Sequence, residues 1–121
     1  MSVSDGGVPA LDPALYQLLE RLIRFDTTSR NSNLELIAHV KDYLSDFGID
    51  SLLVYDETGS KANLYATVGP QDRSGVMLSG HTDVVPVDGQ DWSTDPFSVT
   101  AKGGALFGRG TADMKGFIAC A

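Results

Sequence analysis

Residues 76–86 read Val76-Met77-Leu78-Ser79-Gly80-His81-Thr82-Asp83-Val84-Val85-Pro86, an apolar run followed by polar groups. The apolar start, Val76 to Leu78, predicts a short buried strand. His81 and Asp83 follow two positions apart, which is the strand period, so an extended chain points both side chains the same way. Ligands in α/β proteins collect beyond the carboxyl ends of strands. The segment therefore predicts a site at a strand end, where Asp83 holds the ring of His81 or a second group.

A second polar cluster follows another apolar run, Ala105-Leu106-Phe107. It reads Gly108-Arg109-Gly110-Thr111-Ala112-Asp113-Met114-Lys115-Gly116, and helix-forming residues come after it. Its carboxylate, Asp113, joins His81 and Asp83 as a candidate metal ligand, because Zn²⁺ accepts imidazole nitrogen and carboxylate oxygen. On spacing alone an H-x-D pair is more often structural than catalytic, so these residues indicate a metal site without deciding for one.

Two other enzyme classes fit the sequence poorly. The dinucleotide fingerprint needs a third glycine where Asp113 stands, and a carboxylate there would repel phosphate. The chain also has no Walker lysine pattern and no G-x-S-x-G nucleophile elbow. Nucleotide-binding and serine-hydrolase functions are therefore disfavoured.

Taken together, the two clusters resemble the first two metal-site motifs of a co-catalytic zinc amidohydrolase family. This family includes acetylornithine deacetylase, succinyl-diaminopimelate desuccinylase and aminoacylase. The matching segments are Gly80 to Pro86, Trp92, Asp95-Pro96-Phe97 and Gly108 to Gly116. Two further segments, Val85 to Gln90 and Phe25 to Asn33, look most like the acetylornithine deacetylase branch. The resemblance runs from about Leu15 to Ala121.

The resemblance implies a role for each of three residues. His81 matches a ligand of one zinc ion, and Asp113 matches the carboxylate that bridges two. Asp83 matches a catalytic carboxylate near His81 that orients the ligand or supports the general base. Two zinc ions, with cobalt as an alternative metal, would activate a water and polarise the amide carbonyl. The resemblance also implies a cis peptide bond after Asp113.

The implied reaction is the metal-dependent deacetylation of N-acetylornithine to ornithine and acetate, in arginine biosynthesis. Desuccinylation of succinyl-diaminopimelate and aminoacylase activity are the alternatives within the family. A non-catalytic binding domain that shares the motif strand is the alternative from another class. The implied partner is a small N-acyl amino acid, and the full-length enzyme is expected to be a homodimer.

The family pattern needs more groups than this sequence contains. It adds a Glu-Glu pair, another acidic ligand and a late histidine, whereas no Glu follows Glu57 here and His39 is the only other histidine. We therefore expect this chain to be the N-terminal third of such an enzyme, with residues 12–121 forming the N-terminal portion of its catalytic domain. Alone, this chain is expected to bind zinc weakly and to hydrolyse nothing.

Composition indicates which partners and which cellular location are expected for the protein. A net charge of −7 argues against nucleic acid or an anionic membrane surface as a partner and suits a cationic substrate. Cys120 is the only cysteine, so no intrachain disulfide can form and a cytoplasmic location is favoured. The N-terminus lacks the pattern of a signal peptide, and no apolar run approaches the roughly 18–20 residues of a membrane span. A soluble cytoplasmic protein is the expectation.

Local patterns predict an α/β chain: part of a three-layer αβα zinc-hydrolase catalytic domain with a mixed sheet, incomplete at the C-terminus. Residues 1–11 are expected to form a flexible tail. Asp12-Pro13 predicts the start of a helix, and Ser32 with Glu35 predicts a capping box for a second helix that Gly48 ends. Its buried stripe would be Leu36 or Ile37, Val40, Leu44 and Phe47. The other expected elements are strands 51–55 and 62–68, a hairpin over 98–107 turning at Gly103-Gly104, and a helix from Ala112 or Asp113.

Overall fold

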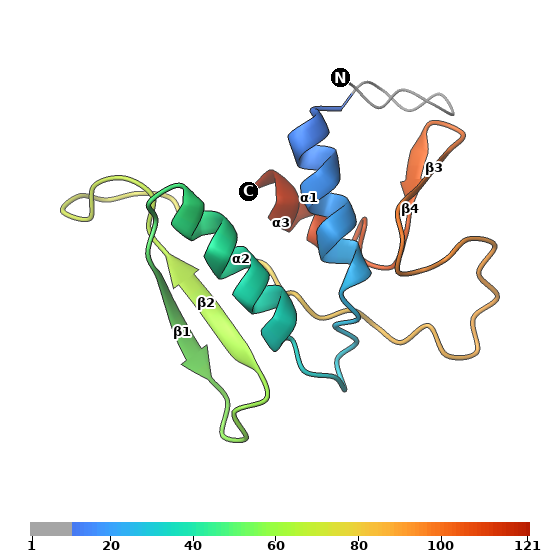
Figure 1. Ribbon diagram of the computed structural model, residues 1–121, viewed down its shortest axis with the longest axis horizontal. Helices are drawn as coiled ribbons and strands as arrows, with labels where there is room; N and C mark the ends of the chain where they lie inside the picture. The colour runs from blue at the N-terminus through green and yellow to red at the C-terminus, as the bar shows by residue number, and fades with distance from the viewer. Residues whose placement is uncertain (1–10) are drawn as a thin grey trace.

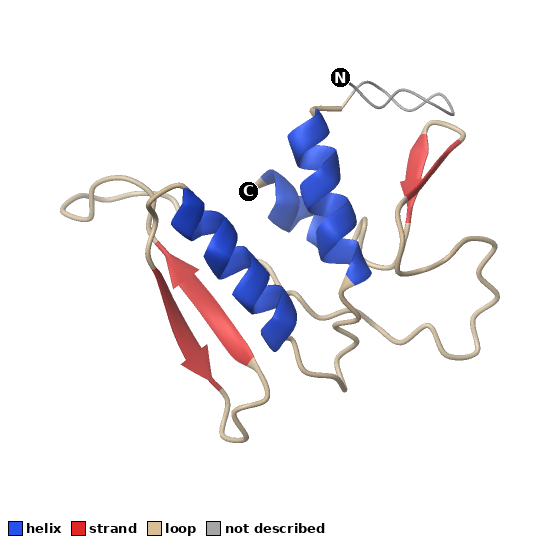
Figure 2. Ribbon diagram, viewed as in Figure 1, coloured by secondary structure: helices blue, strands red, loops and turns tan. Residues whose placement is uncertain are grey.

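The computed structural model describes residues 11–121, so the tail predicted for residues 1–11 lies, apart from Leu11, outside the described residues. Within these residues, three helices and two strand pairs are joined by long loops (Figure 1, Figure 2). The elements are α1 (Pro13–Arg24), α2 (Leu34–Asp46), β1 (Ser51–Tyr55), β2 (Ala62–Ala66), β3 (Thr100–Lys102), β4 (Ala105–Phe107) and α3 (Lys115–Cys120). The predicted α/β class is confirmed. No helix within residues 11–121 combines the length and the apolar character needed to cross a bilayer.

Helix α1 begins as its sequence predicts. The Asp12 carboxylate accepts hydrogen bonds from the backbone N–H groups of Ala14, at 2.8 Å, and Leu15, at 3.3 Å. Pro13 occupies the first helical position, where no backbone N–H is needed. One face of the helix is buried, through Leu19, Leu22 and Ile23. Helix α3 packs against α1, and the two cross at the centre of the molecule (Figure 1).

Helix α2 differs from the prediction in its N-cap and in the burial of Phe47. The capping box is wrong: Asn33 is the N-cap residue, and the Ser32 hydroxyl accepts a bond from the Leu34 N–H at 3.1 Å. Leu36 and Ile37 are buried as expected, but Phe47 is 67% exposed. Its ring packs against Tyr43 outside the core, with the ring centroids 5.3 Å apart and the ring planes tilted by 55°. Gly48 ends the helix with a positive φ of 73°, as predicted.

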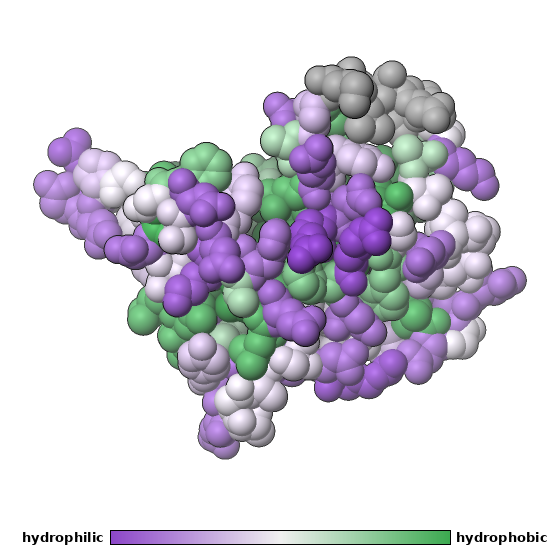
Figure 3. Space-filling view, in the orientation of Figure 1, coloured by the Kyte–Doolittle hydropathy of each residue, from purple (hydrophilic) through white to green (hydrophobic). Residues whose placement is uncertain are grey.

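Strands β1 and β2 form the predicted antiparallel hairpin, although β2 stops at Ala66 instead of residue 68. Helix α2 covers one face of this hairpin (Figure 1). A cluster of buried core residues lies between α1, α2 and β2 and is formed by Leu22, Leu36, Ile37 and Ala62. The other face of the hairpin exposes Leu52 and Val54, and Figure 3 shows hydrophobic surface over β1.

The strand predicted for Val76 to Leu78 is wrong. These three residues have no regular structure, and their side chains are 60–89% exposed. A strand requires hydrogen bonds from a neighbour, and no strand lies beside this segment within residues 11–121. The strands instead form two separate antiparallel pairs, β1–β2 and β3–β4. The motif segment makes one parallel bridge, between Thr28 and Val84.

The turn between β3 and β4 lies where the sequence predicts it, whereas α3 begins later than predicted. Strands β3 and β4 meet at Gly103-Gly104, whose φ angles of 60° and 82° suit a tight hairpin turn, as predicted. Helix α3 begins at Lys115, two to three residues later than expected. The difference arises because residues 111–114 form a turn before the helix.

Asn33 connects the start of α2 to β2 and to the motif segment. Its side-chain amide donates to the Ala62 carbonyl at 2.9 Å and accepts from the Ala62 N–H at 3.0 Å. It also donates to the Thr82 hydroxyl at 3.3 Å. Asn33→Ala is expected to lower the free energy of unfolding in urea by about 2 kcal/mol, because it leaves the backbone of Ala62 unpaired. Asn63→Ala, at an exposed position in the same strand, is the matched control, and an equal loss in both variants would contradict this prediction.

Candidate functional site

His81 and Asp113 meet although 32 positions separate them. The His81 Nε2 lies 2.8 Å from Asp113 Oδ1, so the predicted approach of these two residues is confirmed. Both groups are accessible, with side chains 48% and 83% exposed respectively. An imidazole nitrogen and a carboxylate oxygen therefore share one patch of surface.

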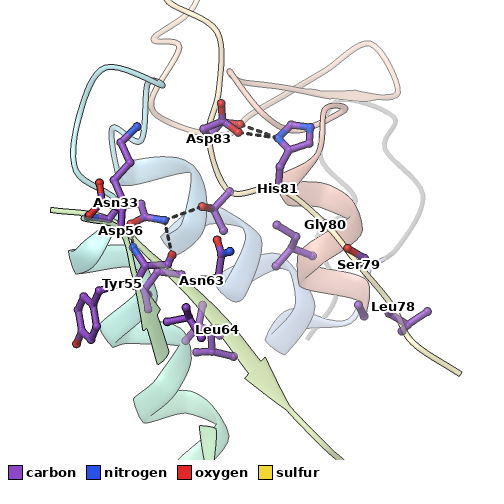
Figure 4. A pocket seen from close by; sticks show the side chains of 18 of the residues that line it. Asn33, Tyr55, Asp56, Asn63, Leu64, Leu78, Ser79, Gly80, His81 and Asp83 are labelled. Carbon is purple, nitrogen blue, oxygen red and sulfur yellow. Dashed lines mark hydrogen bonds and ion pairs between the residues drawn. The ribbon is translucent and has the colours of Figure 1, made fainter. Parts of the chain in front are cut away.

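The second ring nitrogen of His81 faces Asp83. Nδ1 lies 2.9 Å from the Asp83 carbonyl oxygen and 3.2 Å from Asp83 Oδ1 (Figure 4). A carbonyl oxygen only accepts, so Nδ1 carries a hydrogen and donates it. In the neutral ring this assignment leaves the Nε2 lone pair directed at Asp113. In the neutral ring the Asp83 carbonyl thus fixes the tautomer of His81, and the catalytic role that the resemblance implies for the Asp83 carboxylate stays a prediction.

The charges around the imidazole favour its protonated form. The pKa of His81 is raised, first by the hydrogen bond to the Asp83 carbonyl and then by the Asp113 carboxylate. The pKa of Asp83 is lowered, chiefly by a hydrogen bond from the Ser29 hydroxyl and also by the charge of His81. Asp83 is therefore a stable anion, and a cation bound at Nε2 would take the place of the proton.

The chain leaving α1 holds the 81–84 segment in place. Val84 donates its N–H to the Thr27 carbonyl, and Ser29 donates to the Val84 carbonyl, both at 3.1 Å. The buried Thr27 hydroxyl donates to the Thr82 carbonyl at 2.6 Å. These bonds fix the backbone on both sides of Asp83, so its position depends on residues more than fifty positions earlier in the chain.

The turn that carries Asp113 contacts the same segment. The His81 N–H lies 3.3 Å from the Met114 sulfur. The Asp113–Met114 peptide bond is cis, as the resemblance implied. Gly80 lets the two segments approach, because a Cβ there would lie 3.1 Å from Ile118 Cγ1 and 3.2 Å from Met114 Cε.

Arg109 fixes a loop and does not reach the candidate ligands. Its guanidinium lies over the Trp92 ring, 5.0 Å from the centroid, and donates to the Gln90 side chain. Trp92 donates to the same Gln90 oxygen at 2.8 Å. Arg109 therefore has a structural role in this loop, with an aromatic and an amide partner.

A cavity of about 640 Å³ opens beside this site, between β2 and residues 78–83 (Figure 4). His81 and Asp83 line its edge, together with Asn33, Asn63 and Leu78. Asp113 does not line it, so the cavity borders the site from the Asp83 side. Within residues 11–121, no three His, Cys, Asp or Glu side chains gather as a metal-ligand set. The described part of the chain thus brings together two candidate ligands, His81 and Asp113.

Lys115 is the residue whose role the sequence did not reveal. Its side chain is completely buried, and Nζ donates to the carbonyls of Leu22 and Phe25 at 2.8 Å each. These carbonyls lie at the carboxyl end of α1, where backbone acceptors lack helical partners. No local pattern could have indicated this contact, because the acceptors are 93 and 90 positions away.

The burial of Lys115 predicts a dependence of stability on pH. Desolvation lowers its pKa from 10.5 to about 8, and the negative charge of Asp26 opposes part of this shift. Between these two values the unfolded chain binds more protons, so the free energy of unfolding rises as the pH rises. The expected gain reaches about 3 kcal/mol and should be absent in Lys115→Met. Urea unfolding of both proteins at several pH values tests this, and a constant difference between them would contradict it.

Comparisons with known proteins agree with the motifs. Residues 77–121, which include His81, Asp83 and Asp113, match the model of peptidase family M20/M25/M40. The chain is 44% identical over 89 residues to an acetylornithine deacetylase of Shigella sonnei (strain Ss046), an alignment covering 73% of this chain and 23% of that protein. It is 40% identical over 114 residues to an acetylornithine deacetylase of Pasteurella multocida (strain Pm70), covering 88% and 30% respectively.

The chain thus spans less than a third of the length of either curated relative. The resemblance read from the two motifs is confirmed: residues 77–121 match peptidase family M20/M25/M40, and the chain is similar to part of the acetylornithine deacetylases.

Proposed function

We propose that this chain forms part of a metal-dependent amide hydrolase that converts N-acetylornithine to ornithine and acetate, a step of arginine biosynthesis in the cytoplasm. The observation that carries the proposal is the 2.8 Å contact between His81 and Asp113 within the segment that matches the family. Both curated relatives are acetylornithine deacetylases, which favours this substrate over other N-acyl amino acids.

The paired side chains suit zinc, with cobalt as an alternative. Zn²⁺ binds imidazole nitrogen and carboxylate oxygen, and both donors are exposed here. His81 Nε2 would hold one metal ion, and the Asp113 carboxylate would be a ligand shared by two. Metal ions bound there would acidify a water and polarise the substrate carbonyl.

The residues of this chain would prepare the site for the metal. Asp83 keeps Nδ1 of His81 in a hydrogen bond, so Nε2 stays available. The Ser29 hydroxyl holds the Asp83 carboxylate in turn. The net charge of −7 favours the approach of the cationic amino group of an ornithine derivative.

Two ligands are fewer than a catalytic zinc requires, which is normally three protein ligands and a water. We propose that residues outside this chain supply the remaining ligands and the base, and that residues 12–121 are the N-terminal portion of the catalytic domain. The 121-residue chain alone should therefore hydrolyse nothing. The complete enzyme is proposed to act as a homodimer.

Amine release from N-acetylornithine and from N-succinyl-diaminopimelate tests the proposal. The assay compares the 121-residue chain with the longest natural protein that contains it, each with zinc. We expect acetylornithine cleavage only in the longer protein, lost in His81→Ala and kept in His39→Ala. Cleavage of the succinyl substrate alone would keep the reaction class and change the substrate, and inactivity of the longer protein would favour a binding domain. Activity of the 121-residue chain that His81→Ala removes would contradict the need for further residues.

A further inference from the structure

Lys115 stands two residues after Asp113, at the first position of α3. Lysine is almost never fully buried unless its charge is paired, yet no part of this side chain is exposed. Among the described residues, its hydrogen-bond acceptors are the carbonyls of Leu22 and Phe25. The carboxyl end of a helix carries partial negative charge and free carbonyls, so it suits an ammonium group.

The stem of Lys115 also fits a gap that Gly110 leaves open. A Cβ at residue 110 would lie 3.2 Å from Lys115 Cδ and 3.1 Å from Val84 Cγ1. The Lys115 stem and the Val84 side chain therefore both lie against Gly110, where a larger residue would displace them. Lys115 thus packs against Gly110 with its methylene groups and binds the end of α1 with its charge.

The residues that accept hydrogen bonds from Lys115 are close in sequence to those that hold the segment of His81 and Asp83. Phe25 is two residues before Thr27, which binds the backbone of Thr82 and Val84. Four residues after Phe25, Ser29 binds the Asp83 carboxylate. The ammonium group thus joins the turn that carries Asp113 to the stretch that positions Asp83 and, through it, His81.

We propose that Lys115 is a positioning residue, which holds Asp113 opposite His81 by anchoring the Asp113 turn to the carboxyl end of α1. The importance of this role rests on the proposed metal site. Asp113 is 83% exposed and has few neighbours of its own, so its place is fixed by what holds the turn from behind. Removing the ammonium donors while keeping the stem should release Asp113 and leave the apolar packing in place.

The experiment measures the contact itself, without metal or substrate. The chain has two histidines, so the ring signals of His81 and His39 can be assigned by NMR. In the wild type, Asp113→Asn is expected to shift the His81 signals. In the Lys115→Met background, which keeps the stem, Asp113→Asn should shift the His81 signals much less. In the Lys115→Arg background, part of the wild-type shift should return. Because no metal is present, failure of the proposed function would leave this result unchanged.

Leu36→Ala is the matched control, because it destabilises the core without touching the ammonium contact. It should keep the full effect of Asp113→Asn on His81. If Lys115→Met does not fold, Lys115→Gln, which is too short to reach both carbonyls, takes its place with the same expectation. Two results would overturn the proposal. Asp113→Asn could shift the His81 signals as much in the folded Lys115 variant as in the wild type, or Leu36→Ala could reduce this shift as much as the Lys115 variant does.

Discussion

Gly116→Ala is expected to destabilise the protein by about 3 kcal/mol, although alanine is the better helix former. Gly116 lies in the first turn of α3, and a Cβ there would overlap the carbonyl oxygen of Thr111. The obstacle is backbone, so no side chain can rotate away to make room. The turn that carries Asp113 would have to move, and the His81–Asp113 contact should weaken with it.

Urea unfolding and the His81 ring signals measure both consequences. Gly75→Ala is the matched control, because no atom lies within 4 Å of a Cβ at that position and its φ is not positive. Its stability should change by less than about 0.5 kcal/mol. If Gly116→Ala were as stable as this control, the close approach of residues 111 and 116 would be wrong.

Elements defined by neighbouring residues could be predicted from the sequence. Asp12 and Pro13 specify the start of α1 because the cap and its partners lie within three positions. Gly103 and Gly104 specify the β3–β4 turn because both adopt positive φ. In each case the interaction that forms the structure lies within the pattern that predicted it.

Elements that depend on distant partners could not be predicted. Val76 to Leu78 has the composition of a strand, but a strand forms only where another backbone lies beside it. The capping box at Ser32 failed because Asn33 takes the N-cap position and its side chain binds Ala62, 29 positions away. Phe47 continues the apolar period of α2 but lies outside the core.

In the candidate site, too, some features follow from local sequence and others depend on distant residues. His81, Asp83 and Asp113 could be selected from two motifs, because their residue types are those of metal ligands. The backbone next to Asp83 is also held by the bridge between Thr28 and Val84, which no local pattern encodes. Lys115 was within a recognised motif, yet its burial depends on carbonyls at the end of α1.

His81→Ala is expected to lower the zinc affinity of this chain by at least about tenfold, because it removes the imidazole from a pair of donors. Asp113→Asn should have a comparable effect, since a neutral amide is a poorer zinc ligand than a carboxylate. His39→Ala and Cys120→Ser are the matched controls. His39 is the second imidazole, and Cys120 is the exposed thiol that could bind zinc adventitiously.

The most direct test of whether His81 and Asp113 form one metal site is their zinc affinity. It is measured by competition with a chromophoric chelator, in the wild type and in each of these variants. The prediction is that each single substitution weakens binding and that the double variant is little weaker than either one, because one donor alone does not retain the ion. Zinc binding as tight as wild type in His81→Ala or in Asp113→Asn, or an equal loss in His39→Ala, would contradict it.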